Sequence, residues 1–464
     1  MIPFYHPIAI SKRWLGMVVA IGIISLAKSA IANDANCRTI PLLPGTPEAL
    51  AKAEATDAFC TVDFSSDNTA ICAKTWSTSA AALVYDLAGT GWEDRRAAFE
   101  QEVCPQGTHA IDKASRELAV FKHSMNFRDT SGTYAPAILL YDHLSRWLGT
   151  TVQVPAAAEY RFAPEWYAQR VVAPGLSLAS QHPSRKMLLA AWQHLEDALQ
   201  GGDAGREFLD PDTGQVWGAA LLFTGRRYGP EINGTRESGW GKGQNYDFQH
   251  TAPFLALRHP GDLATATAAG INEARTDPAM AEALAADTGT TQVAWWMLEV
   301  LDIVVLDYIL GQQDRIGNID YQWRWLWLED NALHSATAQS ETPPAPGAVH
   351  LRTTWLNDND AGIRSGYANY ARSTGMLSGL RHFNPVLYQR LGVLAEDMVA
   401  KGPVYQAIAG NYHLSSREVA AIADRIGEVR QLITADCKAG NYRFDLEPGV
   451  ILGNAEPPKG IACE

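Results

Sequence analysis

The stretch Leu306–Tyr321, which reads LDYILGQQDRIGNIDY, decides how this chain is interpreted. An apolar run ends at Gly311, and a short polar turn follows that carries Asp314, Arg315, Asn318 and Asp320. The residues after the turn, YQWRWLWL, alternate as the side chains of a β-strand do. The pattern therefore predicts a buried helix, a polar turn and a strand in succession. Alone, such a turn is as typical of a structural loop rich in Asx residues as of a functional site.

The residue types in this turn suit phosphoryl transfer. An Asp can orient and deprotonate an attacking hydroxyl, and an amide or carboxylate a few residues later can hold a metal ion on the phosphates. Two further charged residues stand in the same order as in kinases: Lys122 near the end of the strand predicted at Glu117–His123, and Asp358 after the apolar strand VHLRTTWL. Each has an ordinary alternative, namely a solvated lysine on a strand, and an Asx turn or calcium-binding loop.

Length and charge set the broad class. The chain has 464 residues, of which 47% are hydrophobic, and a net charge of −13. Residues 1–32 hold Lys12, Arg13 and Lys28 and no acid, so without them the net charge is about −16. A balance this acidic argues against a broad surface for nucleic acid or for an anionic membrane.

The first residues predict export. Lys12 and Arg13 precede the apolar run WLGMVVAIGIISLA, and Ala30-Ile31-Ala32 resembles a cleavage site. We expect a signal peptide over residues 1–32, no stable membrane anchor, and a periplasmic or secreted protein; a retained anchor is the alternative. The six cysteines lie near the two ends of the chain: Cys37, Cys60, Cys72, Cys104, Cys437 and Cys463. They predict up to three disulfides, and the sequence does not choose among the fifteen pairings.

The order of the predicted elements indicates an α+β protein with two lobes. We expect a cysteine-bearing extension over 33–105, a smaller strand-rich N-lobe with a hinge over 106–225, and a larger helical C-lobe over 226–464. The glycine-rich part of 225–244 is predicted to be a mobile loop, and 261–290 a helical region interrupted at Gly270 and Pro278. The alternating Trp323, Trp325 and Trp327 are interpreted as the core face of a strand rather than as a ligand platform. His123 and His143 are interpreted as packing or surface residues.

Five blocks of the chain resemble a known family. They are GTHAIDKASRELAVFKHSM, LYDHLSRWLGTTVQVPAAAEYR, LDYILGQQDRIGN, WLNDNDAGI and GLRHFNPVLYQRL, and they lie within residues 107–395. In this order they resemble the secretory-pathway kinases, which include the Golgi casein kinase and the glycosaminoglycan xylosylkinase. The block around Asp314 also resembles that of the phosphatidylinositol kinases. The resemblance implies a kinase-like fold that binds ATP with Mg²⁺ or Mn²⁺ and phosphorylates a hydroxyl of a protein, glycan or lipid.

The resemblance also implies a role for each matching residue. Lys122 corresponds to the lysine that anchors the phosphates, Asp314 to the catalytic aspartate, and Asp358 to the metal-binding aspartate. Asn318 or Asp320 is the expected second metal ligand. Gly107 and Thr108 match the start of the strand that covers the nucleotide. The strand VWGAALLF resembles the hinge that holds adenine, so the expected pocket residues are Ala220, Leu221, Leu222 and Phe223.

Two departures from the family pattern leave alternatives open. The helix after Lys122 lacks the expected glutamate near Ile138, for which Asp142 or Glu159 is a candidate replacement, and Asp360 stands where the family has glycine. A degenerate kinase fold that only binds a nucleotide or a partner is therefore one rival. A calcium-dependent adhesion protein that uses the loop N-D-N-D structurally is the other. The sequence contains no G-x-S-x-G, H-E-x-x-H or Walker A motif.

Overall fold

The computed structural model describes residues 36–51, 59–202, 205–222, 225–285, 288–330, 332–338, 342–453 and 455–464. The predicted signal peptide lies outside these residues. The described chain is a mixed α+β protein, with 45% of residues in helices and 16% in strands, which confirms the predicted class.

The first sheet carries Lys122. Its six strands all pair antiparallel, in the spatial order β1 (Asn36–Arg38), β5 (Ala157–Phe162), β6 (Val216–Leu221), β4 (Arg116–His123), β3 (Ala82–Asp86) and β2 (Thr69–Ala73). The strand predicted at Glu117–His123 is therefore confirmed as β4. Lys122 lies opposite Ala219 of β6, the strand predicted to lead into the hinge.

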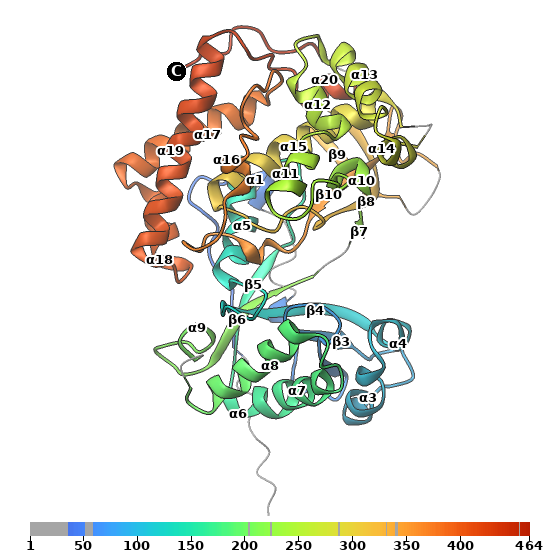
Figure 1. Ribbon diagram of the computed structural model, residues 1–464, viewed down its shortest axis with the longest axis vertical. Helices are drawn as coiled ribbons and strands as arrows, with labels where there is room; N and C mark the ends of the chain where they lie inside the picture. Colours follow the sequence, from blue (N-terminus) through green and yellow to red (C-terminus); the bar gives the residue numbers. More distant parts are fainter. Residues whose placement is uncertain are drawn as a thin grey trace, which may run out of the picture. The chain divides into compact units, whose positions relative to one another are not determined.

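The two faces of this sheet pack against different helices. Phe121 and Phe162 point to one face, which α6 (Pro164–Tyr167), α7 (Ala173–Ser180) and α8 (Lys186–Leu199) cover from below in Figure 1. Helix α5 (Ala135–Leu148) lies on the opposite side. Its N-terminal turn contains Pro136 and it ends at Gly149, which has a left-handed φ of 69°.

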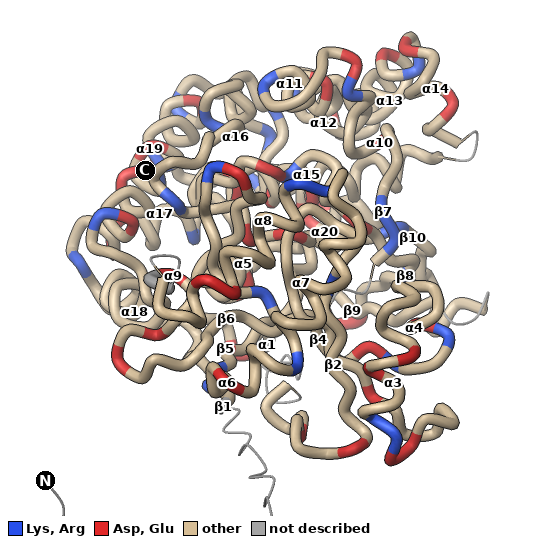
Figure 2. Tube along the Cα trace, turned by 60° about the horizontal axis from the view of Figure 1, so that its bottom comes forward, with Lys and Arg blue, Asp and Glu red and all other residues tan. Residues whose placement is uncertain are grey.

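The second sheet follows the polar turn. Strand β8 (Ile319–Glu329) pairs antiparallel with β10 (Val349–Leu356), β7 (Arg226–Arg227) and β9 (Ala332–Thr337). The two arginines of β7 form the blue segment beside β8 and β10 in Figure 2. The stretch 225–244, predicted to be a loop, thus contains β7 and also α10 (Pro230–Asn233) and the start of α11 (Lys242–Phe248).

The interpretation of the tryptophan stripe as a core face is wrong. Trp323 is 42% exposed, and its ring contacts His350, which also stacks on Trp325. Leu326, which points to the other face of β8, is the buried residue of this part of the strand. Alternation shows that a strand has two different faces, but it does not show which face meets the core.

Helix α15 (Thr290–Leu310) is the central element of the larger core. Nearly all of its residues are buried on every side, because it packs against α12 (Ala252–Arg258), α13 (Leu263–Ala274) and α5. Gly270 does not interrupt α13 as predicted. A Cβ at this position would lie 2.4 Å from the Ala252 carbonyl oxygen, so glycine allows α13 to approach α12 closely.

The remaining helices frame the two sheets. They are α1 (Glu48–Ala51), α3 (Arg96–Glu102), α4 (Thr108–Ala114), α9 (Gly205–Phe208), α14 (Pro278–Ala283), α16 (Tyr370–Ser373), α17 (Pro385–Ala400), α18 (Pro403–Asn411), α19 (Ser416–Lys438) and α20 (Pro448–Ile451). Helices α17, α18 and α19 lie within the segment 226–464 that was predicted to be mainly helical. Across the described residues, no helix combines the length and the apolar character that a bilayer crossing needs.

All six cysteines form disulfides, in the pairs Cys37–Cys60, Cys72–Cys104 and Cys437–Cys463. Each bond joins residues close in sequence near one end of the chain. Disulfides of this kind are typical of exported proteins. His123 and His143 are both buried, as packing residues are, and burial lowers the pKa of His123 to about 3.

Helix α15 carries a buried ionisable residue, Glu299, which forms hydrogen bonds with β10. Trp295 Nε1 and the Thr354 backbone N–H both donate to Glu299 Oε1 at 2.8 Å, and Thr354 Oγ1 lies 2.5 Å from Oε2. Burial raises the pKa of Glu299 to about 8. The three donors favour the charged carboxylate, but burial outweighs them and favours the protonated form.

We predict that Glu299 makes folding stability fall as the pH rises. Because its folded-state pKa is above the model value of 4.5, the folded protein holds a proton that the unfolded chain releases between about pH 4.5 and pH 8. Glu299→Gln mimics the protonated form and should remove this loss of a few kcal/mol. Urea unfolding of both proteins at pH 5 and pH 8.5 measures it. The exposed Glu396→Gln is the control, and an unchanged pH dependence in Glu299→Gln would refute the assignment.

Candidate active site

The centre of the site is a buried ion cluster around Lys122. Its Nζ lies 2.6 Å from Asp358 Oδ1 and 2.8 Å from Asp360 Oδ2, and only 2% of the lysine side chain is exposed. Burial disfavours the charged lysine, but the two carboxylates outweigh this effect and raise its pKa. The pKa of Asp358 is held below its usual range in spite of burial, mainly by Lys122. The predicted lysine and the predicted metal-binding aspartate are therefore in direct contact.

Asp360 supplies the acid that the sequence seemed to lack. Ile138 is buried in the core of α5, as its apolar side chain requires. Neither candidate replacement contacts Lys122: Asp142 pairs with Arg146 at 2.6 Å, and Glu159 pairs with Arg161 at 2.8 Å. The residue that departs from the family's glycine is instead the second carboxylate on the lysine.

Arg315 ties the polar turn to the segment after β10. Its guanidinium is buried and donates twice to Asp307, from Nε at 2.9 Å and from Nη2 at 3.0 Å. Nη1 donates to the Asn357 carbonyl at 2.6 Å, and Nη2 to Asn359 Oδ1 at 2.8 Å. These bonds hold the residues on both sides of Asp358 against the turn that carries Asp314.

Asp314 lies at the edge of this cluster. Asp314 is exposed, and its side chain makes no hydrogen bond or ion pair with another residue that the structure describes. Partial burial and the negative charges of Asp358 and Asp360 raise the pKa of Asp314, while Arg315 and Arg236 oppose them. A carboxylate with a raised pKa that stays accessible is suited to accept a proton.

A cavity of about 260 Å³ opens beside the cluster. Sheet residues Leu83, Tyr85 and Val120 form its apolar wall. The polar lining includes Lys74, Glu117, Arg227, Asp320, Asn357 and Asp358. Burial and repulsion from Lys122 lower the pKa of Lys74, and burial together with Asp112 raises the pKa of Glu117 to about 7. Sequence reasoning missed Lys74, which follows β2, and Glu117 of β4, because nothing in the sequence around them distinguishes them from surface residues.

The predicted second metal ligands are held by Arg227. Its Nη1 donates to Asn318 Oδ1 at 2.7 Å, and its Nε lies 2.6 Å from Asp320 Oδ1. Asn357 Nδ2 donates to Asp320 Oδ2, which leaves Asn357 Oδ1 buried and without a hydrogen-bond partner among the described residues. Asn357 lines the same cavity as Asp320 and Asp358, and amide and carboxylate oxygens are ligands of the kind that Mg²⁺ prefers.

No ready-made metal centre accompanies these oxygens. Within the described ranges, no three His, Cys, Asp or Glu side chains form a group that could hold a metal ion. Asp358 and Asp360 both face Lys122, so in the loop N-D-N-D it is an ammonium group that contacts the carboxylates. A metal ion at Asp358 or Asp320 would have to share them with Lys122 or Arg227.

The strand expected to begin at Gly107 and Thr108 is not formed. Gly107, with φ 85°, precedes helix α4, and Thr108 is the first residue of that helix. The family-based expectation of a nucleotide-covering strand is therefore wrong at this position. Thr108 still lines the cavity, together with Asp112 from the next turn of α4.

The predicted hinge residues take different positions. Leu221 lies opposite Val120, so its side chain shares the cavity face of the sheet. Ala220 lies opposite Phe121, and its side chain packs in the core on the other face. Leu222 packs partly against that same core, and Phe223 lies outside the described residues. Ala220 therefore does not offer its side chain to the cavity as expected.

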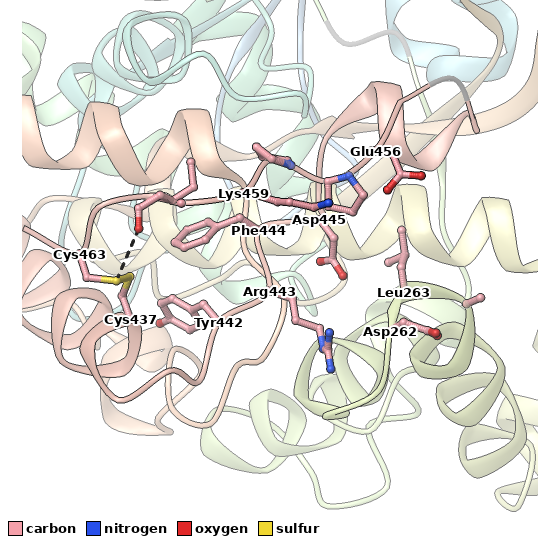
Figure 3. A pocket seen from close by; sticks show the side chains of 15 residues that line it. Asp262, Leu263, Cys437, Tyr442, Arg443, Phe444, Asp445, Glu456, Lys459 and Cys463 are labelled. Carbon is pink, nitrogen blue, oxygen red and sulfur yellow. Dashed lines mark hydrogen bonds between the residues drawn. A yellow bond between two sulfur atoms is a disulfide. The ribbon is translucent and has the colours of Figure 1, made fainter.

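A larger cavity lies near the C-terminus. It measures about 680 Å³ and is lined by residues 262–264 and by the chain around the Cys437–Cys463 disulfide (Figure 3). None of its described lining residues belongs to the predicted site. Its polar groups are of mixed sign, with Asp262, Asp445, Glu456, Arg443 and Lys459 around it.

Comparison with known proteins assigns no family. No protein-family model matches the chain, and no curated protein matches it. The site is therefore argued from its geometry.

We predict that Lys122 and Asp360 are energetically coupled. Removing one partner of a buried ion pair costs about 3–5 kcal/mol, and Asp360→Ala should cost about 2–3 kcal/mol because Asp358 remains. A double-mutant cycle with Lys122→Met, followed by urea unfolding, should give a coupling energy above about 1 kcal/mol.

The matched cycle pairs Lys122→Met with Glu159→Ala, the acid that sequence reasoning proposed. The effects of these two substitutions on the free energy of unfolding should be additive to within about 0.5 kcal/mol, since Glu159 contacts other cations. Equal coupling in the two cycles would contradict the observed pairing.

Proposed function

We propose that this protein is an exported kinase-like phosphotransferase, related to the secretory-pathway kinases, that moves the γ-phosphoryl group of ATP to a hydroxyl of a protein, glycan or lipid. Its fold would have two kinase-like lobes, and its location would be the periplasm or the extracellular space. The observation that carries the proposal is the contact of Lys122 with Asp358 across 236 residues of chain. Burial and the negative charges of Asp358 and Asp360, the two acids that contact Lys122, raise the pKa of Asp314.

The roles follow from the chemistry of each side chain. Lys122 is a point charge suited to the α- and β-phosphates once a nucleotide separates it from the carboxylates. Asp314 is the free carboxylate that would orient the acceptor hydroxyl and take its proton. Asp358, with Asn357 and Asp320 or Asn318, would hold Mg²⁺ or Mn²⁺. The metal would supply positive charge to the phosphates.

One observation favours a second candidate, a nucleotide-binding module without catalysis. The cation that should meet the phosphates is neutralised by two carboxylates, and helix α5 offers it no acid. If that cluster does not open, a nucleotide could occupy the cavity without being aligned for transfer.

Two measurements test the proposal. ATP with Mn²⁺ should raise the melting temperature, since a ligand that binds only the folded state stabilises it. Labelled phosphate from γ-labelled ATP should enter at least one of three acceptor probes: casein, a xyloside or phosphatidylinositol. Asp314→Ala should keep the thermal shift and lose labelling by about 10²–10⁴-fold.

The outcomes separate the candidates. Equal labelling by the wild type and Asp314→Ala would remove Asp314 from its role. A thermal shift without labelling by the wild type would favour the binding module. No shift with ATP and either metal ion would overturn both.

A further inference from the structure

A second cation, Arg236, packs against the turn that carries Asp314. Its Nη2 donates to the Ile316 carbonyl at 3.3 Å, and its guanidinium lies over the ring of Trp240 at 4.7 Å. Its backbone has φ 61°, a left-handed conformation that costs a non-glycine residue on the order of 1 kcal/mol. The chain thus adopts an unfavourable backbone conformation where it places this side chain.

The turn is shaped to receive the guanidinium. Gly317 has φ 90°, and a Cβ there would lie 1.5 Å from Arg236 Nη2. The contact therefore requires glycine at this position, both for the backbone angle and for the space. Two anchors hold the segment around Arg236: Asn233 Oδ1 accepts the Gly317 N–H at 2.9 Å, and Asp247 accepts from Ser238 N at 2.9 Å.

The charge of Arg236 is not neutralised by an ion pair with any carboxylate in the described ranges. The side chain is half-buried, and its guanidinium lies over the exposed ring of Trp240. The positive charge of Arg236 lowers the pKa of Asp314, whereas burial raises it. Neither Arg236 nor Asp314 is among the described residues that line the cavity beside Asp358.

We propose that Arg236 is a further catalytic residue, an inference that rests on the proposed function. Arg236 contacts the oxygen atoms of the γ-phosphoryl group while this group is transferred to the hydroxyl that Asp314 deprotonates. In this step the acceptor oxygen forms a bond to the γ-phosphorus, and the bond from the γ-phosphorus to the β–γ bridging oxygen breaks. The hydroxyl proton moves to the Asp314 carboxylate, and ADP leaves with the electron pair. A guanidinium offers a planar set of donors that matches phosphoryl oxygens.

The test compares Arg236→Ala and Arg236→Lys with Lys242→Ala, which removes an exposed cation from the same segment. Arg236→Ala should lower the rate of labelling at saturating ATP by about 10²–10³-fold. The thermal shift with ATP and Mn²⁺ should be unchanged in it. Arg236→Lys should recover only part of the rate, because it lacks the fork of donors, and Lys242→Ala should behave as the wild type. Added guanidinium ion at tens of millimolar should restore part of the activity of Arg236→Ala and none of that of Asp314→Ala.

The outcomes distinguish this inference from the proposed function. If Asp314→Ala abolishes labelling and Arg236→Ala labels as fast as Lys242→Ala, only the role of Arg236 is overturned. If Asp314→Ala labels like the wild type, or the wild type labels none of the three probes, both proposals fail. A loss of the ATP-induced thermal shift in Arg236→Ala would place the residue in nucleotide binding and would also overturn its assignment to the transfer step.

Discussion

The site depends on the burial of one ammonium group. A charge as poorly exposed as that of Lys122 costs several kcal/mol to remove from water unless close partners replace its hydration. Asp358 and Asp360 do so, and both come from the segment after β10, which lies more than two hundred residues later in the chain. The six-stranded sheet and the end of the second sheet must therefore meet for the lysine to be satisfied. The site therefore forms when the two sheets pack together as the chain folds.

A second buried cation gives the site its shape. Arg315 contacts Asp307 at the end of α15, the Asn357 carbonyl and the Asn359 side chain at once. It has a bidentate acid and two further acceptors, so its donors are matched in fixed directions. This geometry sets the distance between the turn of Asp314 and the segment of Asp358. Lys122 joins the two sheets, whereas Arg315 defines how the acidic residues lie toward each other.

The sequence predicts local elements of this fold better than their surroundings. The strands β4 and β10 were expected with nearly the correct ends, because the spacing of apolar residues is a local signal. Trp323 was placed in the core because alternation does not distinguish the two faces of a strand. Gly107 was assigned to a strand from resemblance alone, and its positive φ fits the start of a helix equally well. The tertiary environment decided both cases.

The residues of the site also differ in whether the sequence could identify them. Lys122 and Asp358 could be selected in advance, since Lys122 stands near the end of a strand and Asp358 lies shortly after the end of another. The role of Asp360 could not, because it depends on a lysine more than two hundred residues away. Its position had counted as a departure from a family pattern that expects glycine there and an acid on the preceding helix. In this structure the acid that contacts the lysine is Asp360, in the loop after β10. Ile138, at the helix position where the family has an acid, belongs to the apolar core.

The lining of the cavity constrains which ligand it can accept. Its described ionisable groups are four acids, Asp112, Glu117, Asp320 and Asp358, and two cations, Lys74 and Arg227. A triphosphate brought into such a lining meets more negative than positive charge, and at short range in a partly dehydrated cavity that repulsion is strong. Binding therefore requires additional positive charge, from a divalent cation on the carboxylate and amide oxygens or from release of Lys122 by its two partners. A metal held by Asp358 would supply positive charge and would compete for one of the two carboxylates that contact Lys122, while Asp360 would remain on the lysine.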